Sequence, residues 1–120
     1  MLTGIDHVQL AAPAGCEAAA RDFFGGTLGL EELEKPGELK ERGGVWFRCG
    51  DQQIHIGVEE EFSPARKAHP AFHVAGYDAL LVRLRKAGFE PAEDDAIPGV
   101  RRSFVDDPFG NRIELLGVLK

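Results

Sequence analysis

Hydrophobic and polar residues alternate along several short stretches of the chain, which is the pattern of half-buried β-strands. In the first stretch, IDHVQLA, the side chains of His7 and Gln9 would point to one face and those of Val8 and Leu10 to the other. Later stretches, such as VWFRC and QIHIGV, are also rich in β-branched and aromatic residues. We expect strands at residues 5–11, 28–34, 45–49, 53–58, 69–75, 89–93, 101–106 and 112–119.

Two other stretches have the spacing of helices. CEAAARDFF, residues 16–24, is rich in Ala and is followed by Gly25 and Gly26. YDALLVRLRKA, residues 77–87, is amphipathic and is followed by Gly88. The glycines are predicted to end both helices. Residues 38–44 and 59–67 are polar, and we expect them to form loops.

The order strand, helix, strand, strand, strand occurs twice, so the chain contains an internal repeat. His7 and His69 begin the first strand of each half and are separated by 62 positions (69 − 7). His55 and Glu114 lie in the last strand of each half and are separated by 59 positions (114 − 55). Module one covers about residues 3–60 and module two about residues 68–118. A module of about 60 residues buries little apolar surface alone, so we expect the two to pair in a single domain over residues 3–118.

Three histidines and one glutamate are the candidates for chemistry. If a pseudo-twofold axis relates the modules, His7, His55, His69 and Glu114 would converge on one concave surface. Imidazole nitrogens and carboxylate oxygens are ligands of divalent metals such as Zn, Ni, Mn or Fe. His73 would share a face with His69 and is an alternative ligand. The pattern therefore favours a divalent-metal site.

Three segments, IDHVQLA, HPAFHV and DDPFGNRIELL, closely resemble the vicinal oxygen chelate superfamily. This superfamily includes glyoxalase I, bleomycin resistance proteins, extradiol dioxygenases and fosfomycin-resistance enzymes. The resemblance implies an α+β fold in which two βαβββ modules form a curved, eight-stranded mixed sheet around a metal cup. It also implies that His7, His55, His69 and Glu114 match the four ligand positions, with His69 favoured over His73 by its H-x-A-F-x-V context.

The function implied by the resemblance is that of a divalent-metal-dependent, glyoxalase-like lyase or isomerase. Its substrate would be a small molecule with vicinal oxygens, and Glu114 would move a proton. His55 departs from glyoxalase I, which usually has Glu at that position. Two alternatives stay open, an extradiol-type dioxygenase and a metal-free protein that binds a small molecule or antibiotic, as bleomycin resistance proteins do. In the second, the cup would be lined by aromatic side chains, namely Trp46, Phe47, Phe72 and Phe104.

Composition narrows the partners of this 120-residue chain. Its formal net charge of −6 disfavours binding to nucleic acid. No apolar run reaches the roughly 20 residues that span a bilayer, and the N-terminus lacks the pattern of a signal peptide. Cys16 and Cys49 do not make a disulfide framework. We expect a cytoplasmic protein with a small-molecule substrate and no nucleic-acid or membrane partner, and the resemblance implies a homodimer, with the ligands meeting within one chain or across two.

Overall fold

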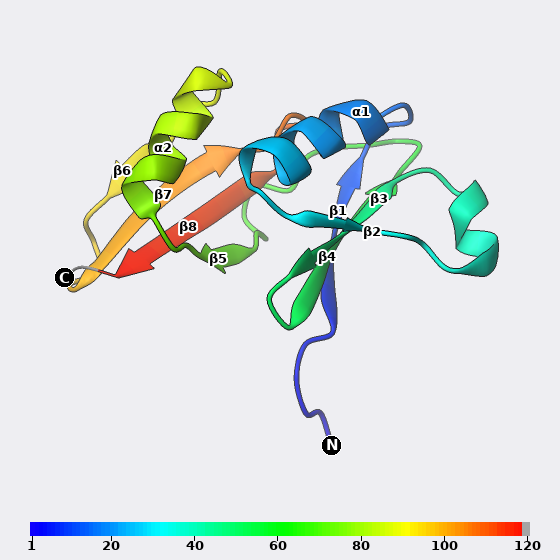
Figure 1. Cartoon of the computed structure of the whole chain (residues 1–120), viewed down its shortest axis with the longest axis horizontal. Coiled ribbons are helices and arrows are strands. Elements are labelled where there is room, and N and C mark those ends of the chain that lie inside the picture. Colours follow the sequence, from blue (N-terminus) through cyan, green and yellow to red (C-terminus); the bar gives the residue numbers. More distant parts are fainter. Residues whose placement is uncertain (119–120) are drawn as a thin grey trace. The chain divides into compact units, whose positions relative to one another are not determined.

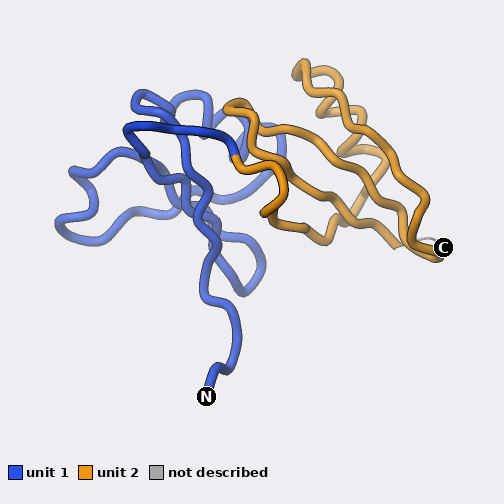
Figure 2. Tube along the Cα trace, turned by 180° about the vertical axis from the view of Figure 1, so that it is seen from behind, with its two compact units in different colours: residues 1–64 blue, residues 65–120 orange. Residues whose placement is uncertain are grey.

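A computed structural model describes residues 1–118 of the chain, which form two compact units. Unit 1 comprises residues 1–64, and unit 2 begins at residue 65 (Figure 2). Each unit contains one four-stranded mixed sheet with a helix packed on it (Figure 1). Over the described residues the two sheets together have eight strands, in the predicted order strand, helix, strand, strand, strand within each unit. The α+β class and the repeated βαβββ module are therefore confirmed.

Unit 1 has the sheet order β1-β4-β3-β2. Its strands are β1 (His7–Ala12), β2 (Glu31–Leu33), β3 (Val45–Cys49) and β4 (Gln52–Val58). β1 lies parallel to β4, and the other neighbours are antiparallel. Between β1 and β2 the chain forms α1 (Glu17–Ala20), which continues into a π-helix, η1 (Arg21–Thr27), and a 3-10 helix, η2 (Gly37–Glu41), precedes β3.

One face of the unit 1 sheet carries the core. Phe47, Ile54 and Ile56 are buried there, together with Phe23 and Phe24 of η1. Because side chains alternate along a strand, the intervening positions of β1, β3 and β4 face the other way. That second face carries the candidate chemical residues of unit 1.

Unit 2 repeats this arrangement in the sheet order β5-β8-β7-β6. Its elements are β5 (Ala71–His73), α2 (Tyr77–Lys86), β6 (Ala92–Asp94), β7 (Val100–Asp106) and β8 (Arg112–Val118). β5 lies parallel to β8, while β6–β7 and β7–β8 are antiparallel. Leu81 and Leu84 of α2 are buried, as are Val105, Ile113 and Leu115 of the sheet.

Several boundaries differ from the prediction. The glycine pair Gly25-Gly26 does not end the first helix but lies inside η1, and neither residue has the positive φ of a helix-ending glycine. β5 is shorter than expected because Pro70 has no N–H to donate to the sheet, although its carbonyl accepts a bond from the Glu114 amide. The polar segment 38–44 begins with a 3-10 turn and is otherwise irregular. The last strand was expected to reach Leu119, which lies outside the described residues. None of the helices within residues 1–118 is long and apolar enough to cross a membrane.

Candidate functional site

The first pair of candidate ligands lies on two neighbouring parallel strands of unit 1. In the β1–β4 register, His7 is opposite Gln53 and Gln9 is opposite His55. His7 and His55 are thus diagonal neighbours on the same face of the sheet. Their rings are stacked, with centroids 4.1 Å apart and planes inclined by 18°. The pairing of the two strands therefore brings both imidazoles together within one module.

Trp46 completes a stack of three rings. It lies directly opposite His55 on β3, and its ring is parallel to the imidazole at a centroid distance of 3.8 Å. His55 lies between Trp46 and His7 and is only 4% exposed. Burial lowers the pKa of His55, and the neighbouring His7 acts in the same direction, while Asp6 opposes them. The neutral imidazole, which is the form that binds metals, is therefore favoured.

Hydrogen bonds orient both imidazoles of unit 1. His7 Nδ1 lies 2.9 Å from a carboxylate oxygen of Asp6. His55 Nε2 lies 2.8 Å from the side-chain oxygen of Gln53. These acceptors assign the N–H to Nδ1 of His7 and to Nε2 of His55. The other nitrogen of each ring then carries the lone pair, as in histidines that bind metals through one nitrogen and donate from the second.

The second pair lies within unit 2. His69, two residues before β5, and Glu114, on β8, approach each other with Nε2 and Oε1 2.8 Å apart. His69 Nδ1 lies 2.8 Å from the carbonyl oxygen of Lys67, to which it can donate. Both nitrogens of His69 therefore face oxygen acceptors, Nδ1 the Lys67 carbonyl and Nε2 the Glu114 carboxylate, so the imidazole and the carboxylate lie side by side.

The structure also distinguishes His69 from His73, the two alternative ligands in the second half of the sequence. His73 lies opposite Leu116 on β8 and is exposed. Glu114 is opposite Ala71, and its carboxylate is bonded to His69. The geometry of unit 2 therefore places His69 rather than His73 beside Glu114, although its role as a ligand stays a prediction.

A guanidinium and an aromatic ring surround Glu114. Arg102 Nε lies 3.1 Å from Glu114 Oε2, an ion pair whose geometry is not that of a hydrogen bond. Phe104 lies opposite Glu114 in the β7–β8 register. The guanidinium groups of Arg102 and Arg112 lie over the Phe104 ring, 4.7 and 4.0 Å from its centroid. The side chain of Glu114 is only 12% exposed, so this carboxylate lies beside a guanidinium and an aromatic ring rather than in open solvent.

Sequence reasoning named Trp46 and Phe104 only as possible linings of the cup. Their places are equivalent in the two modules, since each lies opposite a candidate ligand of the last strand, His55 or Glu114. This equivalence could have been found in the sequence, because the internal repeat separates the two aromatic residues by 58 positions (104 − 46). Phe47, also named as a lining residue, is fully buried in the core of unit 1.

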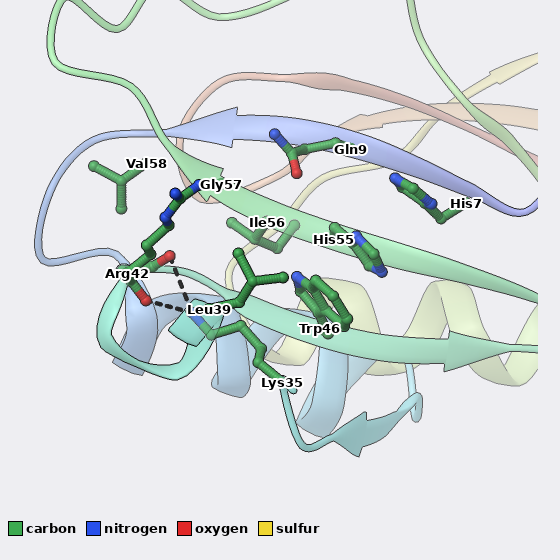
Figure 3. Close-up of a pocket in the computed structure, with 11 residues that line it drawn as sticks. His7, Gln9, Lys35, Leu39, Arg42, Trp46, His55, Ile56, Gly57 and Val58 are labelled. Carbon is green, nitrogen blue, oxygen red and sulfur yellow. Dashed lines mark hydrogen bonds between the residues drawn. The ribbon is translucent and has the colours of Figure 1, made fainter. Parts of the chain in front are cut away.

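A cavity of about 600 Å³ lies on the exposed face of β1, β4 and β3. Figure 3 shows His7 and His55 at one end and the side chain of Arg42 at the other. Trp46 and Leu39 line it between these ends. All lining residues belong to unit 1, so this cavity is a property of a single module.

The candidate ligands lie in two pairs, and their nitrogen and oxygen atoms are of the kinds that bind divalent metals. Within residues 1–118 no group of three or more His, Cys, Asp or Glu is arranged to hold a metal ion. Each unit instead contributes two donors, His7 with His55 and His69 with Glu114. His7 and His55 each have one nitrogen bonded to an oxygen acceptor, as metal-binding histidines usually do, whereas both nitrogens of His69 are bonded to oxygens. Three imidazoles and one carboxylate form a donor set for Zn, Ni, Mn or Fe.

Comparison with known proteins gives one match by family and several by structure. The sequence family model of the Glyoxalase/Bleomycin resistance protein/Dioxygenase superfamily matches residues 4–115 of the chain. A solved structure of a glyoxalase family protein from Bacillus anthracis shares 56% sequence identity with the chain, with a TM-score of 0.94 over 99% of this chain and 98% of that one. No curated protein matches.

Two further structures are similar in fold. Lactoylglutathione lyase from Agrobacterium tumefaciens has a TM-score of 0.75 at 19% identity, over 97% of this chain and 94% of its own. The fosfomycin resistance protein FosX from Listeria monocytogenes has a TM-score of 0.76 at 20% identity, over 99% of this chain and 96% of its own.

Proposed function

Because the chain belongs to the Glyoxalase/Bleomycin resistance protein/Dioxygenase superfamily, we propose that it is a divalent-metal-dependent enzyme, a lyase or isomerase whose small substrate carries two vicinal oxygens. The observation that carries this proposal is the second pair of candidate ligands. His69 donates from Nδ1 to a carbonyl and directs Nε2 at the carboxylate of Glu114. The bond from Nδ1 to a carbonyl is the kind that orients metal-binding imidazoles in proteins, and a bound metal would take the place of the proton that Nε2 shares with Glu114.

The proposed ligands are the two pairs, His7 with His55 and His69 with Glu114. They are supplied either by one chain or by two chains of a homodimer. Their nitrogen and oxygen atoms suit a metal of intermediate softness, such as Zn, Ni, Mn or Fe. When bound, the metal would act as a Lewis acid that polarises the vicinal oxygens of the substrate.

Glu114 is the proposed acid–base residue. One carboxylate oxygen faces the imidazole of His69, and the other faces the guanidinium of Arg102. A carboxylate of low exposure is protected from bulk water and can take a proton from one substrate atom and return it to another. His69, held by the carbonyl of Lys67, orients this carboxylate from the opposite side.

Metal content tests the proposal. Protein purified without chelator and dialysed against Zn²⁺ or Ni²⁺ is expected to hold metal in a fixed stoichiometry, measured by mass spectrometry of the metal. His55→Ala and Glu114→Gln are each expected to weaken metal binding at least tenfold, the usual minimum effect of disturbing a metal site. His73→Ala is the matched control, since His73 is exposed and lies opposite Leu116.

Two results would contradict the metal proposal. The first is metal far below stoichiometric amounts together with no calorimetric heat on adding Zn, Ni, Mn or Co ions. The second is equal weakening by His73→Ala and His55→Ala, because the effect would then not depend on the proposed ligands.

A metal-free small-molecule-binding protein is the second candidate function. It is favoured by the cavity of about 600 Å³ in unit 1, which is of ordinary size for a ligand pocket and has Trp46 on its wall. It is also favoured by the closed stack of His7, His55 and Trp46, in which the imidazoles serve as flat packing surfaces. If the protein binds its ligand without metal, Glu114→Gln would leave ligand binding nearly unchanged. If it is a metal-dependent enzyme, the same substitution would abolish ligand binding.

A further inference from the structure

The charged side chains that line the cavity of unit 1 are cationic, although the chain as a whole is acidic. The whole sequence has 14 Lys and Arg against 20 Asp and Glu. The cavity wall includes Lys35 and Arg42, and no Asp or Glu is among the described residues that line it. The two cations lie on the η2 side of the cavity, and the imidazoles of His7 and His55 lie at its other end (Figure 3). A ligand in this cavity therefore meets positive charge at the end remote from the histidines.

Lys35 and Arg42 have different roles in this wall. The Lys35 ammonium donates to the carbonyls of Arg42 and Gly43, the latter over 3.2 Å. These bonds close the segment that contains η2 and hold Arg42 at the cavity. Arg42 is exposed, and its guanidinium takes part in no ion pair or hydrogen bond among residues 1–118. Lys35 is thus a positioning residue, and Arg42 presents its charge to the cavity.

Two glycines, Gly43 and Gly57, contribute to the cavity wall, and the side chains of Val58 and Gln9 lie close beside them. Gly57 lies on the same face of β4 as His55, two positions further along. A Cβ at position 57 would lie 2.7 Å from the Gln9 amide nitrogen, and one at position 43 would lie 2.7 Å from a methyl of Val58. Two residues of a strand span about 7 Å. Gly57, on the Arg42 side of the wall, therefore lies about that distance along β4 from His55.

We infer that Arg42 binds an anionic group of the substrate. The substrate class is then a small molecule with vicinal oxygens at one end and a carboxylate, phosphate or phosphonate at the other. A guanidinium binds such planar or tetrahedral anions through paired hydrogen bonds. The vicinal-oxygen end rests on the proposed function, whereas the anion subsite rests on the cavity of unit 1 alone.

A pair of probes that differ only in charge tests this subsite. 3,4-Dihydroxybenzoate and 3,4-dihydroxybenzamide share their vicinal hydroxyls and ring, and only the first carries a carboxylate. Binding is followed by ¹⁵N NMR of the full chain through the indole N–H of Trp46, the chain's single tryptophan, which lines the cavity. The titration is carried out on metal-free protein and on protein loaded with Zn²⁺.

The benzoate is expected to bind about tenfold more tightly than the benzamide to both forms, since hydrogen bonds to a charged group are the stronger ones. Arg42→Gln is expected to remove this preference and leave the affinity for the benzamide unchanged. Arg85→Gln removes the same charge from the exposed face of α2 and is expected to keep the preference. The same NMR spectra show whether each variant is folded.

Equal affinity for the two probes in the wild type would overturn the anion subsite, as would a preference that survives Arg42→Gln or a Trp46 signal that neither probe moves. The metal proposal fails in a different way. If Zn²⁺ changes the affinity of neither probe while the benzoate preference persists, the anion subsite stands and the metal-dependent function is contradicted.

Discussion

Single residues decide the local geometry of unit 1, and Glu17 and Gly44 show how. The amide of Gly44 donates to the Glu17 carboxylate over 2.7 Å, which joins the start of α1 to the start of β3. Gly44 has a φ of +103° and lies so close to β4 that a Cβ would be 2.0 Å from the carbonyl oxygen of Ile56. Only glycine meets both conditions.

Gly44→Ala is therefore expected to be one of the most damaging single substitutions. The methyl group cannot be placed without displacing the backbone of β4, and we expect a loss of about 3 kcal/mol or more in the free energy of unfolding. Gly15→Ala is the control, because Gly15 also has a positive φ, of +83°, but an added Cβ there meets no atom within 4 Å. Urea unfolding should show a loss of only about 1 kcal/mol for this control. Equal losses in both variants would contradict the role given to the close approach to Ile56.

Glu17→Gln tests the other half of this contact. The bond from the Gly44 amide lowers the pKa of Glu17 below its ordinary value. We expect the variant to lose about 1 kcal/mol at pH 7, the low end for a bond to a charged group, since the part-exposed carboxylate is screened by solvent. The wild-type advantage is present above the unfolded pKa of about 4.3 and is lost as the pH falls through the lower folded pKa. Urea unfolding at pH 7 and pH 3 measures it.

A matched control separates this effect from the loss of a negative charge. Glu38→Gln removes a carboxylate from exposed η2 that takes part in no described hydrogen bond, and its stability difference should be small at both pH values. A Glu17→Gln difference that stays constant from pH 7 to pH 3 would show that the charge of Glu17 is not what the Gly44 amide recognises.

At the scale of the elements, hairpins decide which residues stand opposite one another. The β7–β8 hairpin turns at residues 107–111, where Asp107 accepts bonds from the amides of Phe109 and Asn111 and from the Asn111 side chain. Asn111 in turn accepts a bond from the amide of Ala65. This turn sets the register in which Phe104 faces Glu114. The sequence DPFGN is typical of a tight turn, but it does not reveal the buried hydrogen bonds that hold this one.

Asp107→Ala is expected to lower the free energy of unfolding by about 2–3 kcal/mol, because it leaves buried donors without their acceptor. Asp51→Ala, at the tip of the exposed β3–β4 hairpin, is the matched control and should cost less than about 0.5 kcal/mol. Hydrogen exchange should show the loss in β7 and β8. If exchange in these strands is unchanged, the turn does not set their stability.

At the scale of the whole molecule, the repeat assigns one pair of candidate ligands to each unit. His7 and His55 belong to unit 1, and His69 and Glu114 belong to unit 2. A metal that uses both pairs would bind only the folded protein and would stabilise both units together. Under the proposed function, added metal would therefore stabilise the whole molecule rather than one module.

Added Zn²⁺ at a hundred times its dissociation constant is expected to raise the free energy of unfolding by about 2.7 kcal/mol, and a chelator should reverse this. His7→Ala in unit 1 and Glu114→Gln in unit 2 should each abolish most of the increase, while His73→Ala should keep it. Thermal unfolding with and without Zn²⁺ provides the measurement. Loss of the increase in only one of the two ligand variants would mean that the metal uses a single pair.

Sequence alone determined the class of the fold, the two modules and the four candidate ligands, because strand alternation and internal repetition are local properties that can be read along the chain. It did not determine which side chains meet. The stack of Trp46 on His55, the ion pair of Arg102 with Glu114 and the place of His69 beside that carboxylate all depend on strand register. Alternation assigns a residue to a face but not to a partner, since register is set by turns and packing between segments far apart in sequence. Only the tertiary structure could therefore gather cations and histidines around one cavity of an acidic chain.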